Sequence, residues 1–291
     1  MSVTTADIKY LREITGAGIL DCKKVLQETS GNIDEAVELL RKKGLAAASK
    51  KASREANEGL VKAQISEDSQ VGVMVEVNCE TDFVARTEDF QNFVDSLVRQ
   101  MLAQPNVDGV EALLAAPYID NAQTTVAEQL TEIIAKLGEN TIVRSAVRFD
   151  LQGDGMIDSY IHIGGRVGVL VEVGGGSPSS PEFMELVHDL ALHIAAASPR
   201  YLDESNVPAE AVEAEKAIYK AQIAEDKKPD NIKERIVEGK LKKWLGEITL
   251  VNQPFVKDND VTISNLVSKA SKSLGSEIQI RRFARFELGV E

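Results

Sequence analysis

The sequence has few of the side chains that build metal centres, redox sites and disulfide frameworks. Its 291 residues include two cysteines and three histidines. Cys22 and Cys79 fall in different predicted segments, and their spacing matches no metal-binding or redox motif. We therefore expect two free thiols with a structural role, as is usual in a reducing cytoplasm, and we expect neither a metal site nor a cofactor.

Basic residues are also fewer than acidic residues. The chain has 33 Lys and Arg against 46 Asp and Glu, which gives a formal net charge of −13 at pH 7. A protein of this charge repels phosphate backbones and anionic lipid surfaces. The N-terminal residues contain no apolar signal core, and no apolar run is long enough to span a bilayer. We expect a cytoplasmic protein that binds neither nucleic acid nor a membrane.

The motifs of common nucleotide-binding and hydrolytic enzymes are missing. The glycine-rich run "VEVGGGSPSS", residues 171–180, lacks the Lys-Ser or Lys-Thr that completes a phosphate loop, and Gly-x-Ser-x-Gly does not occur. His188 and His193 are five residues apart, which differs from the spacing of a metal pair on one helix face. No pair of carboxylates stands out for acid-base chemistry. We interpret the chain as a binding protein and not as an enzyme.

The N-terminal part of the chain, residues 1–45, is predicted to form a small helical module. Glycines separate three short helical runs, and the third run opens with "NIDE", in which Asn32 can cap the helix and Glu35 can return the bond. This helix is predicted to end at Gly44. Three short helices make a marginal core, so the module should pack against a neighbour.

A linker with helical propensity is predicted over residues 46–58, within "AAASKKASREANEG". It is rich in alanine and charge and has no large apolar residues that could build a core. Its basic residues suit a solvated linker or a face for an acidic partner better than a nucleic-acid site, because aromatic stacking residues are absent.

The sequence then contains an internal repeat. "QVGVMVEVN" at 70–78 recurs as "RVGVLVEVG" at 166–174, and an amphipathic helix comes after each copy. "IVRSAVRF" and "IRRFARFELG" form a second repeated strand, which should return the C-terminal segment to the sheet system. These patterns predict an α+β fold with two related subdomains and antiparallel sheets. The predicted units are a first subdomain at 59–140, a second at 141–198 and 246–260, and a C-terminal module at 261–291.

A helical hairpin is predicted as an insertion at residues 199–245. Two helical stretches, 209–225 and 231–245, are separated by "DKKPD". The hairpin is either a solvated excursion or an arm for contacts, including dimerisation.

The connection "NCETDFVARTEDF", residues 78–90, places a large aromatic residue beside acids at the end of a predicted strand. Such loops usually lie at the surface and often carry function. Phe83 is therefore either a plug that packs on Phe90 in the local core or an exposed wedge for a partner.

Five stretches of the sequence point to a known family: "LREITGAGILDCKKVLQETSGNIDEAVELLRKKG", "EVNCETDFVARTEDF", "YIHIGGRVGVLVE", "IVEGKLKKWLGEITLVNQPFV" and "RRFARFELG". Together they resemble the translation elongation factor Ts family, the exchange factors of the GTPase elongation factor Tu. The resemblance covers nearly the whole chain. It implies a ubiquitin-associated-like N-terminal domain, two similar core subdomains, a helical hairpin and a C-terminal module.

The resemblance also implies site residues. Thr81, Asp82, Phe83 and Val84 would form a wedge that disturbs the Mg²⁺ and phosphate region of the GTPase, with Asp82 positioning the wedge. The other residues implied in partner binding are Arg12, Gly16, Gly18, Ile19, Leu20, His162 and Gly164. Ile19 and Leu20 stand where the family often has methionines, which keeps an apolar contact but makes it less adaptable. A homodimer or a 2:2 complex through the hairpin is a further expectation.

Two other functions remain open on the residues alone. The first is an adaptor that recognises a protein partner through the N-terminal module, with no effect on any nucleotide. The second is a hydrolase that uses His162 and an acid, which has no nucleophile or phosphate motif to support it.

Overall fold

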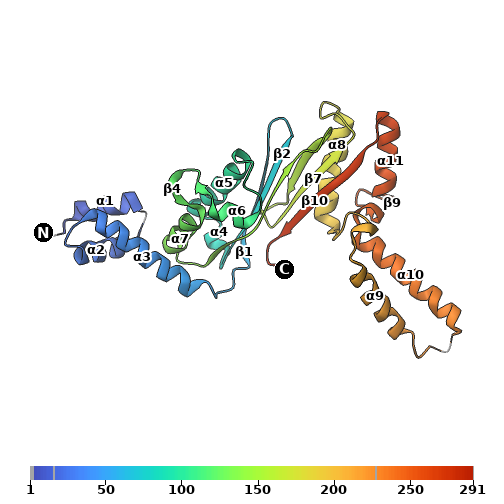
Figure 1. The fold of residues 1–291 in the computed structure, drawn as a ribbon, viewed down its shortest axis with the longest axis horizontal. Coiled ribbons are helices and arrows are strands. Elements are labelled where there is room, and N and C mark those ends of the chain that lie inside the picture. Colours follow the sequence, from blue (N-terminus) through green and yellow to red (C-terminus); the bar gives the residue numbers. More distant parts are fainter. Residues whose placement is uncertain (1–2, 16, 227, 291) are drawn as a thin grey trace.

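The computed structural model describes residues 3–15, 17–226 and 228–290. The chain has the predicted α+β fold, with helices at its N-terminal end followed by antiparallel sheets. Figure 1 shows the N-terminal helices at one end of the molecule, the sheets in the middle and a helical hairpin at the other end.

The N-terminal module consists of α1 (Thr5–Thr15), α2 (Ile19–Glu28) and the first half of α3 (Ile33–Lys51). Its small core comprises Leu11, Cys22, Val25, Leu26 and Ala36, all fully buried. Asn32 caps α3 as predicted, since its side chain accepts a hydrogen bond from the backbone N–H of Glu35 and donates one to the Glu35 carboxylate.

The predicted end of the third helix at Gly44 is wrong, because α3 continues into the predicted linker and ends at Lys51. Residues 45–51 are mostly alanine and lysine, which have high helix propensity. This second half of α3 packs on α7 (Val126–Leu137). Arg41 forms an ion pair with Glu128, and Lys51 donates to the carbonyl oxygen of Ile134 at 3.3 Å. These contacts offset the roughly 1 kcal/mol cost of an interior glycine.

The first sheet has the strand order β1-β2-β5, and all its pairs are antiparallel. Helices and a small two-stranded hairpin cover one of its faces. The elements of this half are β1 (Glu58–Ile65), β2 (Val71–Cys79), α4 (Asp82–Ala85), α5 (Glu88–Ala103), α6 (Gly109–Ala115), β3 (Pro117–Tyr118), β4 (Asn121–Thr125), α7 and β5 (Thr141–Asp150).

The second sheet has the order β10-β7-β6 and is likewise antiparallel. Its elements are β6 (Met156–Ile161), β7 (Val167–Gly174), α8 (Pro181–Ala197), β8 (Pro254–Phe255), β9 (Asp258–Thr262), α11 (Ile263–Leu274) and β10 (Gln279–Glu287). The two repeated strands found in the sequence are thus β2 with β7 and β5 with β10.

The boundary predicted at residue 141 does not follow the sheets. β5 was assigned to the second subdomain, but it pairs with β2, with Ile142 opposite Asn78. The alternating side chains of β5 explain this, since Val143 is buried in the core beneath α5 and α7. The predicted C-terminal module at 261–291 likewise contributes a strand to the second sheet, because β10 pairs with β7 along its length.

The two sheets pack face to face through a third apolar layer. Residues at odd positions of β2, such as Val73 and Val75, face the helices, whereas Met74 faces the second sheet. A Cβ on Gly72 would come within 2.6 Å of Ile157, and a Cβ on Gly168 within 2.5 Å of Val61. The glycine in each repeated "VGV" therefore permits the close approach of the sheets.

The helical hairpin consists of α9 (Ala209–Gln222) and α10 (Asp230–Ile248), inserted between α8 and β8. Short 3-10 turns, Glu204–Asn206 and Leu250–Asn252, lie at its base. Figure 1 shows the two helices side by side, pointing away from the sheets. Among the residues that the structure describes, no helix is both long and apolar enough to cross a membrane.

Candidate protein-binding site

The predicted wedge is an exposed aromatic side chain on a single helical turn. β2 ends at Cys79, and α4 begins at Asp82 with Thr81 as its cap. Phe83 is 79% exposed, whereas Phe90 is fully buried. The alternative in which Phe83 plugs the core on Phe90 is therefore wrong.

The rest of this turn is anchored to the protein. The carboxylate of Glu139 accepts hydrogen bonds from the backbone N–H of Thr81 at 3.0 Å and from its hydroxyl at 2.7 Å. Val84 packs partly against the first core, and Ala85 is buried in it. Only one side of α4 thus faces solvent, and Phe83 projects from that side.

Two neighbours of Phe83 have local partners. Asp82 forms an ion pair with Arg86 at 2.9 Å across one turn of backbone. The thiol of Cys79 donates to the carbonyl oxygen of Thr81 at 3.2 Å, and burial raises the pKa of Cys79 to about 12. At neutral pH this cysteine is a protonated thiol that serves packing, in line with its predicted structural role.

A second exposed loop joins β6 to β7. It contains His162 and Gly164, and Gly164 has a φ of +86°, which favours glycine there. The hydroxyl of Tyr160 and Nδ1 of His162 are 3.0 Å apart. Ile163, between His162 and Gly164, is 89% exposed. Our sequence reasoning missed Ile163, although an apolar residue directly before two glycines was a visible signal.

The β6–β7 loop and the wedge are both attached to the first residues of β1. Val61 donates its backbone N–H to the carbonyl oxygen of Gly165 at 2.7 Å, and Arg166 pairs with Glu58 at 2.6 Å. Glu58 lies opposite Cys79, the last residue of β2 before the wedge, in the β1–β2 ladder. The fold therefore brings two predicted site segments, far apart in sequence, to the same end of β1.

The predicted contacts of the N-terminal module lie on a separate surface. Ile19 is 55% exposed and Leu20 is 80% exposed at the start of α2, where Gly18 is the cap residue. Arg12 is exposed on α1, and Gly16 lies outside the described residues. Figure 1 shows α1 and α2 beyond α7, at the end of the molecule away from the second sheet. A partner that touches both surfaces must span them.

Two further apolar side chains of this module were not predicted. Tyr10 and Ile14, one turn apart on α1, are 54% and 50% exposed. Their signal in the sequence was weak, because apolar residues on an amphipathic helix usually face the core.

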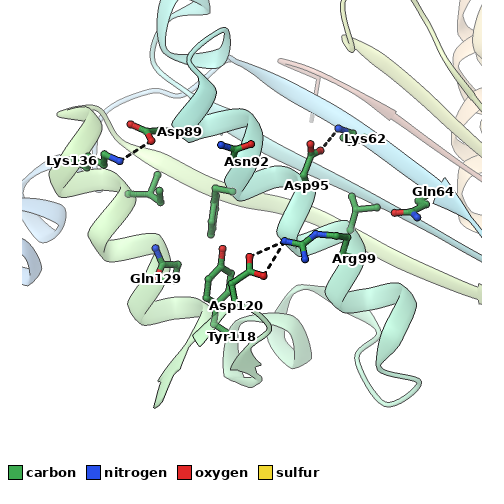
Figure 2. A pocket seen from close by; sticks show the side chains of 13 residues that line it. Lys62, Gln64, Asp89, Asn92, Asp95, Arg99, Tyr118, Asp120, Gln129 and Lys136 are labelled. Carbon is green, nitrogen blue, oxygen red and sulfur yellow. Dashed lines mark hydrogen bonds and ion pairs between the residues drawn. The ribbon is translucent and has the colours of Figure 1, made fainter. Parts of the chain in front are cut away.

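A cleft of about 670 Å³ lies elsewhere, beside α5 and α7. Figure 2 shows its charged side chains joined in pairs across the cleft. Lys136 pairs with Asp89 at 2.7 Å and Arg99 with Asp120 at 2.8 Å, and the remaining pair is Lys62 with Asp95. Since every charged residue lining the cleft is paired, the cleft offers a ligand no uncompensated charge. None of the predicted site residues lines it.

The histidines are held by local contacts. His193 is buried, its Nε2 lies 3.0 Å from Oε1 of Gln253, and burial lowers its pKa. His188 lies 2.9 Å from Asp158. Within residues 3–15, 17–226 and 228–290, no three His, Cys, Asp or Glu side chains are grouped as metal ligands.

These features define a class of protein before any relative is considered. An α+β scaffold presents apolar side chains on an anchored loop and on a helical module, which is the surface of a protein that binds other proteins. The family model described as "Elongation factor TS" matches residues 80–290.

Three bacterial proteins named elongation factor Ts are similar along almost their full length. The protein of Clostridium perfringens (strain SM101 / Type A) is 48% identical over 287 residues, covering 99% of this chain and 93% of its own. That of Trichlorobacter lovleyi is 47% identical with the same coverage, and that of a Nitratiruptor species is 45% identical, covering 99% and 94%. The chain belongs to the elongation factor Ts family, the nucleotide exchange factors of translation elongation.

Proposed function

We propose that this protein acts in the cytoplasm as the guanine nucleotide exchange factor of elongation factor Tu, with residues 81–84 as the segment that drives GDP release. The observation that carries this proposal is Phe83, a large apolar side chain that is 79% exposed on a turn whose other side is fixed to the core. An exposed aromatic residue on a rigid support is the usual form of an interface anchor.

The proposed mechanism uses the sensitivity of a GTPase site to small displacements. A GTPase holds its nucleotide with a phosphate loop and Mg²⁺, and Mg²⁺ requires near-octahedral geometry. Phe83 inserts between elements of the GTPase near this site and shifts them, so that the metal and then GDP are lost. Asp82 stands beside the wedge and competes for a polar group near the metal. No covalent chemistry by this chain is involved.

The remaining predicted contacts supply affinity. Ile19 and Leu20 present apolar area at the start of α2, directly after Gly18, and Arg12 adds an exposed charge on α1 of the same module. His162, Ile163 and Gly164 form a second contact at the wedge end of β1. The helical hairpin remains our predicted site for a homodimer or a 2:2 complex.

The first test is the release of fluorescent GDP from elongation factor Tu with Phe83→Ala. We expect the rate at saturating factor to fall roughly 10- to 100-fold, equivalent to about 1.4–2.8 kcal/mol, with a smaller loss of affinity because most contact area lies elsewhere. Val256→Ala, which shortens another exposed apolar side chain, is the control and should behave as wild type. A wild-type release rate for Phe83→Ala would reject the wedge.

The second test replaces both Ile19 and Leu20 with Asp. Calorimetry should show weaker binding to the GTPase, since charge then faces an apolar contact. Leu45→Asp, at another exposed apolar position on α3, is the matched control. Equal affinity of wild type and the double variant would mean that this surface is idle in the complex.

The adaptor function remains the second candidate, because the apolar surface of the N-terminal module could serve a different partner. Thermodynamic reciprocity separates the two. If the protein weakens GDP binding, GDP must weaken binding of the protein by the same factor. Affinity for elongation factor Tu should therefore fall as GDP is added in a titration. Affinity that is indifferent to GDP would reject exchange and favour the adaptor.

A further inference from the structure

Four residues join the wedge to the start of β5 through reciprocal hydrogen bonds. The Glu139 carboxylate accepts from the N–H and the hydroxyl of Thr81 at 3.0 and 2.7 Å. In return, the Glu80 carboxylate accepts from the backbone N–H of Asn140 at 2.6 Å. We call Glu80, Thr81, Glu139 and Asn140 the clasp.

The clasp also holds the segment that connects the N-terminal module to β1. Arg54, just beyond α3, pairs with Glu80 at 3.3 Å. The side-chain amide of Asn140, which is 2% exposed, donates to the carbonyl oxygen of Arg54 at 2.8 Å. Three distant stretches of chain therefore meet directly before the wedge.

We propose that Glu139 is a positioning residue for nucleotide release, because it fixes the cap of α4 and thereby the direction in which Phe83 projects. The proposal rests on the exchange function above. α4 is one turn of four residues, and a helix of this length has no stability of its own. Its orientation must come from its attachments. The Thr81 hydroxyl accepts from the N–H of Val84 at 3.4 Å while it donates to Glu139.

The second half of the molecule provides an internal comparison. α7 and α11 both end at a left-handed glycine, Gly138 and Gly275. The residue after Gly275 is Ser276, whose hydroxyl donates to the carbonyl oxygen of Gly175 in the loop after β7. In both halves, therefore, the loop after the central strand is hydrogen-bonded to the residue that follows the left-handed glycine, Glu139 in the first half and Ser276 in the second. In the half that carries Phe83 this residue is Glu139, whose carboxylate accepts two hydrogen bonds, whereas the Ser276 hydroxyl donates one.

Glu139 is expected to affect the direction in which Phe83 projects but not the apolar area that Phe83 offers to the GTPase. Without Glu139 the Phe83 side chain is still present and exposed, so the affinity of the factor should change little. The turn then samples several directions, and a smaller share of complexes has the aromatic ring placed to shift the GTPase. The defect should therefore appear in the rate at saturating factor and not in the concentration needed for half-saturation.

The experiment measures GDP release from elongation factor Tu as a function of factor concentration. For Glu139→Ala we expect a roughly tenfold lower saturating rate, with half-saturation within about twofold of wild type. Glu139→Gln should be intermediate, since its amide oxygen keeps one accepting contact to Thr81. Ser276→Ala, which removes the corresponding contact in the second half, is the control and should keep the wild-type rate.

Hydrogen exchange of the free protein gives a readout that does not involve the GTPase. Amides of residues 81–85 should exchange faster in Glu139→Ala, to a smaller extent in Glu139→Gln, and at the wild-type rate in Ser276→Ala. Unchanged exchange would show that Glu139 does not hold the cap. Faster exchange with a wild-type release rate would show that the hold does not serve release. Either result overturns the proposal. A wild-type release rate for Phe83→Ala instead rejects the wedge, on which this proposal rests.

Discussion

The two halves of the core share a set of matching elements in the same order, and besides α6 and the α9–α10 hairpin they differ in the loop after the central strand. β1, β2 and β5 with α5 and α7 correspond to β6, β7 and β10 with α8 and α11. After β2 the chain reads "ETDFVA", whereas after β7 it reads "GGSPSS". The helix-facing cores are built alike in both halves, so this difference in sequence lies in a segment that a partner can reach. The proposed activity of the first half is thus an addition to a scaffold that both halves share.

The two halves also differ in the contacts of two buried acids at matching positions, Glu172 on β7 and Glu76 on β2. Glu172 is fully buried, with Nε of Arg282 at 2.6 Å, Arg281 at 3.4 Å and the N–H of Gln152 at 2.9 Å. Glu76, at the corresponding position of β2, is 3% exposed and has Arg144 at 4.0 Å. In the described part of the chain, Oε1 of Glu76 has no hydrogen-bond partner. Glu172 therefore lies in a network of close ion pairs and hydrogen bonds, whereas Glu76 has Arg144 at 4.0 Å as its ion-pair partner in the described part of the chain.

The largest effect on this comparison should come from Glu172→Gln. The substitution leaves two guanidinium groups without their buried counter-charge, and unpaired charges of this kind are costly. Since Arg281 and Arg282 are partly exposed, we expect a loss of about 2 kcal/mol in the free energy of unfolding. Urea denaturation measures it, with the exposed Glu277→Gln as control. Equal stability of the two variants would mean that the network contributes little.

A second matched pair is Arg148 on β5 and Arg285 on β10. Arg148 donates to the carbonyl oxygens of Met101 and Leu102 at the end of α5, and Arg285 donates to that of Ala195 at the end of α8 at 3.3 Å. Each arginine thus satisfies the carbonyl end of the helix on its own sheet. Arg148 and Arg285, at matching positions of the repeated strand, therefore have a common role.

The pair predicts a smaller and graded effect. Each arginine pairs with the acid two residues on, Arg148 with Asp150 at 2.6 Å and Arg285 with Glu287 at 2.7 Å. Arg148 is the more deeply buried of the two, and Nε of Arg285 has no partner among the residues described. We expect Arg148→Met to cost about 1.5 kcal/mol, the lower end of the range for hydrogen bonds of charged groups. Arg285→Met should cost about 1 kcal/mol, because Arg285 donates to a single helix carbonyl and that contact is long, at 3.3 Å. Thermal unfolding of both variants tests the order. A greater loss for Arg285→Met would contradict it.

The sequence was sufficient for the features that depend on local pattern. The repeated valine strands and the capped helix at Asn32 were predicted, because alternation and capping act over a few residues. For Phe83 the local pattern left a core plug and an exposed wedge both open. The matched pairs β3–β4 and β8–β9 were missed, since two- to five-residue strands carry too little pattern.

Features that depend on distant contacts were not predictable in the same way. The boundary predicted at residue 141 was wrong because β5 pairs with β2, a strand more than 60 residues earlier in the sequence. Ile142, for example, lies opposite Asn78. Glu139 gave no signal, since its contact with Thr81 spans 58 residues. Gly44 was read as a helix end because the packing of α3 on α7, which offsets its cost, is absent from the local sequence.

The smallest expected effect concerns Glu76 and has the opposite sign to that of Glu172. Burial raises the pKa of Glu76 above the ordinary value of 4.5. The unfolded chain therefore releases this proton at a lower pH than the folded protein, and wild type loses stability as pH rises from about 4.5 through the raised pKa. Gln is neutral in both states and avoids this loss. Glu76→Gln should thus match wild type at pH 4 and be more stable by about 1 kcal/mol at pH 8. Urea denaturation at both pH values measures the difference, and a variant less stable than wild type at pH 8 would show that Arg144 pairs with Glu76 more strongly than their 4.0 Å separation indicates.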